Sequence, residues 1–277
     1  MNYLELTLPS PEENLACDEA LLELCEEGLA EETLRVWESP QYFVVVGYAN
    51  QVATEVNVPF CRQNGVPILR RCSGGGTVLQ GRGCLNYALS LRIDESGPFR
   101  SITSTNQVVL ERNRTILQAL LQTPVSICGQ PTPAPAPNLN LNLNLNLNPN
   151  PPPNPLLQTP VQIRGYTDLA LGGLKFSGNS QRRKRRALMF HGALLLEFDL
   201  ALIERALLMP SREPDYRAHR SHSDFLVNFP VPARQVALAL RRGWGAGSTL
   251  SEIPLERIGK LAREKYATRE WTWKFDG

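Results

Sequence analysis

The sequence predicts an α+β protein with a mixed β-sheet and helices packed on the outside of that sheet. Three features lead to this prediction. A helix with clear start and stop signals opens the chain, apolar strand-like runs separated by glycine-rich turns follow it, and helical periodicity dominates the C-terminal part. With 277 residues, 42% of them hydrophobic, the chain can bury one large core or two modest ones. We expect one domain over residues 1–277.

Composition narrows the class of protein. The net charge of +2 creates no global field that would attract nucleic acid or a membrane surface. No apolar run approaches the roughly 20 residues of a membrane-spanning helix, and the N-terminus lacks the pattern of a signal peptide. The cysteines show no CxxC pairs or zinc-like spacing, which predicts reduced and mostly buried thiols; they are Cys17, Cys25, Cys61, Cys72, Cys84 and Cys128. We therefore expect a cytoplasmic protein without nucleic-acid or membrane partners.

The first predicted helix begins after Ser10. Ser10 is a good N-cap, Pro11 suits the first helical position, Glu13 completes a capping box and Gly28 marks the end. Strands are predicted at 34–37 and 42–47, and the second is apolar on both faces, as in a central strand. A short helix near 59–63 and a strand at 67–69 follow.

The next stretch is rich in glycine. Gly74, Gly75 and Gly76 are consecutive, which suits a backbone that approaches a ligand or adopts positive φ. Arginines before them and hydroxyl side chains beside them offer donors for an anionic group. Alone, the pattern equally fits a solvated turn. A half-buried strand at 85–91 follows, and then a helix at 104–121 with Ser104 and Gln107 as a capping pair.

The segment from about 131 to 160 changes character. It alternates leucine and asparagine between runs of proline, and asparagine is a poor strand residue. This composition predicts a disordered, low-complexity surface insertion. The alternative is a segment that docks a partner or aggregates through its leucines.

A second motif follows the insertion. Lys175 lies between Leu174 and Phe176 and between two glycine-containing turns, an unusual place for a surface lysine. Strands are predicted on either side of it, at 166–171 and 188–198, with a basic run at 182–186. Helices are predicted at 199–208, 231–242 and 254–266.

The two motifs together resemble the lipoate–protein ligase family. Here they read RRCSGGGTV with LNY, and TDL with KFSGNSQRR and HGALL. The resemblance implies a biotin/lipoate-ligase-like fold in a short form without the C-terminal accessory domain. It implies ATP- and Mg²⁺-dependent activation of lipoate or octanoate to an acyl adenylate. The acyl group would then pass to a lysine of a lipoyl carrier domain, a 2-oxoacid dehydrogenase E2 or a glycine-cleavage H protein, with or without a separate accessory subunit.

The resemblance also implies roles for individual residues. Lys175 would be the catalytic residue, holding phosphate and acyl carbonyl. Nucleotide and acyl binding would fall to residues in and beside the motifs, namely Arg70, Arg71, Ser73, Gly74, Gly75, Gly76, Thr77, Val78, Leu79, Gln80, Asn86, Asp168, Gly178 and His191. Magnesium would arrive with ATP, with Asp168 as an additional ligand, and the protein alone would form no metal site. Arg182, Arg183, Arg185 and Arg186 would face an acidic carrier domain.

Each role has a structural alternative. Asn86 could cap a strand end, Asp168 could belong to a turn, and His191 is better explained as a structural histidine beside the acyl pocket than as a metal ligand or base. The arginine run also resembles a nuclear signal.

The departures from the family pattern bear on the reaction. Cys72 occupies the position where the family usually has a third basic residue. Related octanoyltransferases use a cysteine nucleophile near the second motif, but residues 165–168 contain none. This favours a ligase over an octanoyl or lipoyl transferase, for which Cys72, Cys84 and Cys128 would be the thiols to test. A non-catalytic lipoyl-binding protein is the third alternative. Biotin ligation is disfavoured because the GRGRxGRxW signature is missing.

Overall fold

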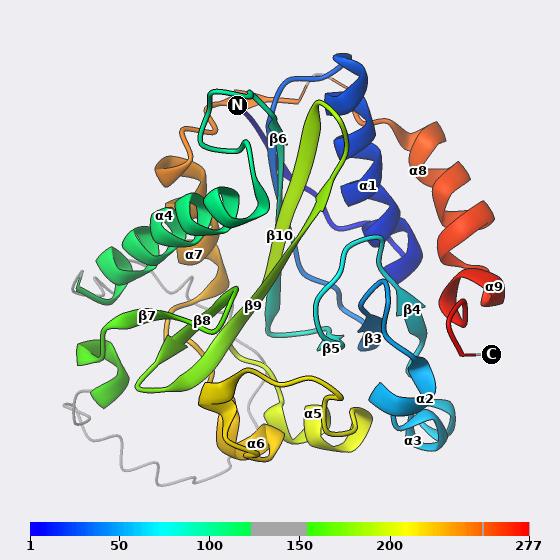
Figure 1. Ribbon diagram of the computed structural model, residues 1–277, viewed down its shortest axis with the longest axis vertical. Coiled ribbons are helices and arrows are strands. Elements are labelled where there is room, and N and C mark those ends of the chain that lie inside the picture. Colours follow the sequence, from blue (N-terminus) through cyan, green and yellow to red (C-terminus); the bar gives the residue numbers. More distant parts are fainter. Residues whose placement is uncertain (123–153, 251, 277) are drawn as a thin grey trace, which may run out of the picture.

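The computed structural model describes residues 1–122, 154–250 and 252–276, and the predicted mixed sheet is present (Figure 1). Its strand order is β11-β1-β2-β6-β10-β9-β8-β7. Strand β1 pairs in parallel with β2 and β11, and the other neighbours are antiparallel. The strands are β1 (Asn2–Glu5), β2 (Thr33–Trp37), β6 (Cys84–Arg92), β7 (Val161–Arg164), β8 (Asp168–Leu171), β9 (Leu174–Arg183), β10 (Ala187–Leu195) and β11 (Ser248–Thr249).

Three further strands form a separate small sheet. Strand β3 (Phe43–Val46) lies between β4 (Ile68–Arg70), which is parallel to it, and β5 (Val78–Gln80), which is antiparallel. All of β3 is buried, as predicted for a central strand. Because β4 ends and β5 begins at the glycine-rich stretch, this sheet fixes both ends of that loop (residues 71–77, called the glycine loop below).

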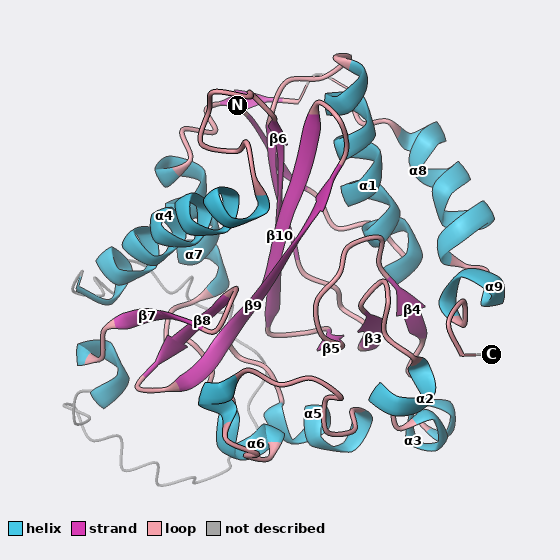
Figure 2. Cartoon of the chain, in the orientation of Figure 1, coloured by secondary structure: helices cyan, strands magenta, loops and turns pink. Residues whose placement is uncertain are grey.

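Helices cover both faces of the large sheet (Figure 2). Helix α1 packs on one face with α8, and α4 packs on the other with α7 (Figure 1). The helices are α1 (Pro11–Glu27), α2 (Val52–Glu55), α3 (Val58–Gln63), α4 (Ile102–Gln122), α5 (Leu200–Ala206), α6 (His222–Phe225), α7 (Ala233–Gly243), α8 (Leu255–Leu261) and α9 (Arg269–Thr272), with a π-helical turn at Ala262–Tyr266. Within the described part of the chain, none of them is long and apolar enough to cross a membrane.

The predicted start and end of α1 are confirmed. The Ser10 hydroxyl accepts from the Glu13 N–H, the Glu13 carboxylate accepts from the Ser10 N–H, and Gly28 closes the helix at φ 76°. Positive φ at a helix end is readily adopted by glycine, so the local sequence is enough to define this helix.

Two details of the first half differ from the prediction. Helix α4 begins earlier than expected, because Ser101 rather than Ser104 accepts the first free N–H. Strand β6 is buried on both faces instead of one, with only Arg92 exposed. The large apolar side chains of β6 pack in the core on the α4 side, and its small and polar side chains face α1. The alternation in the sequence therefore marks two buried faces of different character, and neither face is exposed to solvent.

The low-complexity prediction is tested only at its end. Residues 131–153 lie outside the described residues. The last part is ordered, contrary to the prediction: Pro155–Gln158 forms a 3₁₀ turn, and Leu156 and Leu157 pack against the core on the α4 side.

Candidate functional site

One row of residues crosses five strands of the large sheet and lines a cavity of about 130 Å³. Strand register places the five residues side by side, in the order Trp37, Asn86, Ala193, Gly178 and Asp168. The cavity lies on the α1 face, where Leu15 and Asp18 also border it. The glycine loop and β5 form the opposing wall, so both sequence motifs meet here.

A β-bulge brings Lys175 into this row. Residues three apart in a regular strand point to opposite faces, which would separate Lys175 from Gly178. The pairing of β8 with β9 shifts, so that Leu169 faces Ser177 while Ala170 faces Lys175. Phe176 is the extra residue, and Lys175 consequently reaches the same face as Gly178. A Cβ added at Gly178 would lie 3.0 Å from Lys175 Nζ, so the glycine leaves room for the ammonium group.

The Lys175 ammonium has one carboxylate partner. Its Nζ lies 2.8 Å from Asp168 Oδ1, and the Tyr216 hydroxyl donates to Asp168 Oδ2 over 2.8 Å. The Lys175 side chain is 25% exposed and lines the cavity, so its remaining N–H donors are available to an anion. Tyr216 was not predicted. It comes from a loop beyond the second motif, and no pattern in the sequence pointed to it.

Asn179 holds the lysine motif in place. Its Nδ2 donates to the Thr167 carbonyl over 2.7 Å, and its Oδ1 accepts from the Tyr87 hydroxyl over 2.6 Å. Asn113 donates to the same hydroxyl and accepts from the indole of Trp244. A hydrogen-bonded chain therefore runs from α7 through α4 and the sheet to the cavity. The sequence prediction missed Asn179, although it lies four residues after Lys175 in the same motif.

The glycine loop is held from inside by Arg71. Its buried guanidinium donates to the carbonyls of Gly74 and Gly76 and to Ser73 Oγ. Burial lowers the pKa of Arg71 to about 10, so it remains charged at neutral pH. On the outer side, the Ser180 hydroxyl donates to the Gly74 carbonyl over 2.9 Å. The predicted loop residues are therefore assembled here, with Gly75, Gly76 and Thr77 lining the cavity.

His191 joins the glycine loop to β10. Its Nε2 lies 2.5 Å from Ser73 Oγ, and the ring lines the cavity. Burial, with a smaller contribution from the nearby Arg71 charge, lowers the pKa of His191 to about 3. The ring is therefore neutral at physiological pH, as suits a structural histidine beside the pocket.

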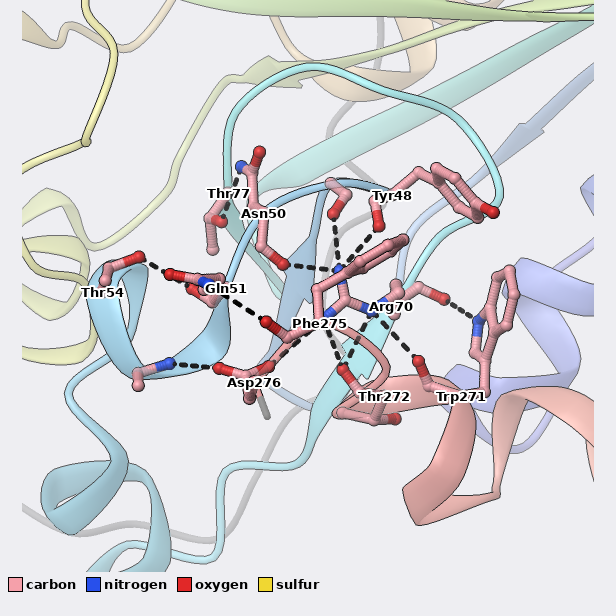
Figure 3. Close-up of polar contacts among 12 residues, drawn as sticks. Tyr48, Asn50, Gln51, Thr54, Arg70, Thr77, Trp271, Thr272, Phe275 and Asp276 are labelled. Carbon is pink, nitrogen blue, oxygen red and sulfur yellow. Dashed lines mark hydrogen bonds and ion pairs between the residues drawn. The ribbon is translucent and has the colours of Figure 1, made fainter.

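Arg70 does not reach the cavity, contrary to the role implied for it. Its guanidinium is fully buried and bonds backbone carbonyls on two sides (Figure 3). Nη1 donates to Gly47, Tyr48 and Asn50, while Nε and Nη2 donate to Thr272 in the C-terminal segment. Arg70 thus fastens the C-terminus beside the loop. Asn50 extends the link, since its Nδ2 donates to the Gly75 carbonyl and to Thr77 Oγ1.

Of the other predicted binding residues, three point into the cavity and one points away from it. Val78, Gln80 and Asn86 line the cavity. Leu79 points to the opposite side of β5 and packs in a separate apolar cluster, so the structure does not bring it to the site. Period-two alternation along β5 explains this difference.

Of the four predicted docking arginines, one makes hydrogen bonds within the protein and three are exposed. The Arg183 guanidinium donates to the carbonyls of Phe99 and Arg100, so it is occupied within the protein. Arg182, Arg185 and Arg186 are exposed, and Arg182 lies over the Tyr48 ring at 5.9 Å. The exposed three lie at the end of β9 and in the turn to β10.

The five described cysteines are all buried, and none lines the cavity. Burial raises the pKa of Cys72 and of Cys84 to about 12, which keeps both thiols protonated at neutral pH. Cys128 lies outside the described residues. Among the residues that are described, no three His, Cys, Asp or Glu side chains gather as a metal site.

Comparisons with known proteins identify the family of the chain. The family model for the lipoyl protein ligase A/B catalytic domain matches residues 10–125 and 155–228, and the chain belongs to this family. An octanoyltransferase LipM of Lysinibacillus sphaericus is 28% identical over 96% of this chain and 95% of its own length. A putative lipoate-protein ligase A of Aeropyrum pernix is 29% identical over 93% of this chain and 79% of its own length.

Solved structures share the fold. A bipartite lipoate protein ligase of Thermoplasma acidophilum, studied with its E2 lipoyl domain, superposes with a TM-score of 0.72 at 19% identity, covering 99% of this chain and 96% of the other. A lipoate-protein ligase A bound with ATP superposes at 0.69 with 22% identity, covering 99% of this chain and 100% of the other. The predicted α+β fold and family are thus confirmed.

Proposed function

We propose that this protein is an ATP-dependent ligase that activates lipoate or octanoate as an acyl adenylate and transfers the acyl group to a lipoyl carrier domain. The observation that carries the proposal is the position of Lys175, whose ammonium group lines the cavity opposite the glycine loop. The cavity is lined by no cysteine among the described residues, so an acyl–thioester step has no evident nucleophile there. The ATP-bound relative with the same fold gives independent support.

The residues suit the two steps. Activation joins a carboxylate oxygen to the α-phosphorus of ATP and releases pyrophosphate, so negative charge gathers at one point. Lys175 and the donors of the glycine loop are placed to stabilise that charge. In the second step the amine of a carrier lysine attacks the acyl carbon, and AMP leaves. Here Lys175 holds the acyl carbonyl and leaving phosphate in position, while the carrier supplies the nucleophile.

Magnesium fits this site as part of the ATP complex. The two cavity carboxylates already have partners, since Asp168 contacts Lys175 and Tyr216, and Asp18 pairs with Arg35 at 2.6 Å. The ATP phosphates would therefore provide most of the magnesium ligands, and Asp168 would be the residue to contribute a carboxylate oxygen.

The exposed arginines suggest how the carrier approaches. Arg182, Arg185 and Arg186 lie on the strand and turn that follow the lysine motif. Positive charge here would steer an acidic carrier domain, such as an E2 lipoyl domain or an H protein, toward the cavity. The E2 lipoyl domain studied with the Thermoplasma ligase supports a carrier of this kind.

The test is pyrophosphate release by purified protein with ATP, magnesium and lipoate, beside Lys175→Ala. We expect acyl-dependent release that falls at least about 100-fold in the variant. Release that is independent of the acid, or unchanged in Lys175→Ala, would contradict the proposal.

The second candidate is an octanoyl transferase that needs no ATP, and the resemblance to octanoyltransferases LipM favours it. It predicts octanoyl exchange between carrier proteins without ATP, and loss of that exchange in Cys128→Ser. If exchange survives replacement of Cys128, Cys72 and Cys84 one at a time, none of these three thiols is the nucleophile, and the transferase hypothesis is contradicted.

A further inference from the structure

The far end of the cavity contains buried polar atoms without partners. Among the described residues, three buried side-chain atoms make no hydrogen bond, and all three belong to residues that line this cavity: Trp37 Nε1, Gln80 Oε1 and Asn86 Oδ1. The Trp37 indole is not isolated, because it interacts with the Asp18 carboxylate. Burial raises the pKa of that carboxylate, and Arg35 and, to a smaller extent, the indole oppose this rise. Gln80 and Asn86 remain. A buried carbonyl oxygen that lines a cavity needs a donor from water or from a bound ligand, and a ligand that displaces the water keeps this stabilisation only if it donates in turn.

The orientation of Asn86 is set by its own strand. Its Nδ2 donates to the Cys84 carbonyl over 3.4 Å, and rotation of the amide would place two oxygens against each other. Oδ1 is therefore the atom presented to the cavity, and it can only accept. Gln80 has no such constraint, and its amide can present either its oxygen or its nitrogen.

The position of Asn86 matches the distal part of an eight-carbon acid. Lys175 Nζ lies over Gly178, and Asn86 is two strands away in the same row, past Ala193. Two strand spacings amount to roughly 10 Å. A carboxylate held at Lys175 would thus extend along Ala193 and bring its last carbons to Asn86, between Leu15 and Val78.

The candidate acids differ in what they offer there. Octanoate ends in methylene and methyl groups, which donate nothing. The cyclic disulfide of lipoate carries sulfurs that are weak acceptors and donate nothing, whereas the dithiol form carries two S–H groups that are weak donors. We propose that Asn86, assisted by Gln80, selects the dithiol form of lipoate over both the cyclic disulfide and octanoate. This inference rests on the proposed function and names the substrate of its first step.

The test compares three acids in the pyrophosphate-release assay: dihydrolipoate kept reduced by a phosphine, oxidised lipoate, and octanoate. For the unaltered protein we expect kcat/KM to be about two- to threefold higher for dihydrolipoate than for either other acid, the lower end of the value of one neutral hydrogen bond, because a thiol is a weak donor. Asn86→Leu removes the acceptor at similar volume, and should bring the three acids to parity by lowering dihydrolipoate and raising octanoate. Gln80→Leu should reduce the preference less.

Asn64→Leu is the matched control, because Asn64 is exposed and distant from the cavity lining. It should keep the original ranking. Equal kcat/KM for the three acids in the unaltered protein, or a preference that survives in Asn86→Leu, would overturn the inference.

The ranking is also measured by equilibrium binding of the three acids without ATP. Pyrophosphate release with none of the acids would count against the proposed ligase function alone, since the binding order still tests Asn86. If Asn86→Leu does not fold, the ranking in the unaltered protein and in Gln80→Leu decides the question.

Discussion

Ser73 Oγ lies 2.5 Å from Nε2 of His191, and this hydrogen bond joins the glycine loop to the centre of the large sheet. The two residues are 118 positions apart, one in each motif. This contact is stable with a neutral imidazole, because a protonated ring would be buried and would lie close to the positive charge of Arg71.

This arrangement predicts acid sensitivity. The pKa of His191 is about 3 in the folded protein and near 6.5 when unfolded. Between these two pKa values the unfolded chain binds a proton that the folded protein does not, so acid favours unfolding. The stability that the neutral ring contributes is therefore complete above pH 6.5 and is lost as the pH falls toward 3. Compared with His191→Gln, the unaltered protein should lose up to about 1.4 kcal/mol more stability per pH unit over this range. Urea unfolding at pH 6.5, 5.5 and 4.5 measures the difference; parallel curves would refute it.

The ion pair of Lys175 with Asp168 predicts a positioning role for the carboxylate. Asp168→Asn keeps the shape but removes the charge that orients the ammonium group, so we expect kcat of pyrophosphate release to fall about tenfold. Tyr216→Phe removes only the neighbouring hydroxyl and should have a smaller effect. Steady-state kinetics of both variants provide the comparison, and an equal or reversed order would argue against this role.

Gly47 is predicted to be essential for the shape of the glycine loop. A Cβ at this position would lie 2.0 Å from the Gly75 carbonyl oxygen, a clash with backbone that only movement of the loop can relieve. Gly47→Ala should therefore lower kcat/KM for ATP by about 10- to 100-fold. Gly247→Ala is the control, since nothing lies within 4 Å of its added Cβ. Unchanged kcat/KM for ATP in Gly47→Ala would show that the glycine loop can move away from the added Cβ without loss of activity, which would contradict the prediction.

Arg70 is predicted to act on stability. Lysine retains the charge but cannot bond the carbonyls on both sides at once, so Arg70→Lys should lower the free energy of unfolding by at least about 2 kcal/mol. It should also expose the segment near Thr272 to proteases. Arg185→Lys, at an exposed position, should change neither. Limited proteolysis with mass spectrometry would locate the cut, and a resistant C-terminus would contradict the fastening role.

The exposed arginines give a prediction for the transfer step. Reversing the charge at Arg185 and Arg186 should slow acyl transfer to carrier about tenfold at low salt, with a smaller difference at high salt, and leave pyrophosphate release unchanged. Arg242→Glu on α7 is the matched control. Equal loss of both half-reactions would show that these arginines serve the cavity and not the carrier.

The sequence by itself determined the elements whose signals are local. Ser10, Glu13 and Gly28 define α1 because capping depends on neighbouring backbone groups. The apolar run at 43–46 defined a buried central strand because a strand with apolar side chains on both faces is stable only when both faces are covered. The order of the two motifs was sufficient to indicate the family.

Only the tertiary structure decided which members of the motifs face the cavity. Arg70 and Arg71 are adjacent in sequence, yet the first bonds the C-terminal segment and the second the glycine loop. The bulge at Phe176 places Lys175 on the side of Gly178, and it arises from pairing with β8. Asn179, Tyr216 and the unpaired Asn86 oxygen depend on partners far along the chain. Side-chain direction and hydrogen bonding between distant strands are set by packing of the whole sheet, which no local pattern encodes.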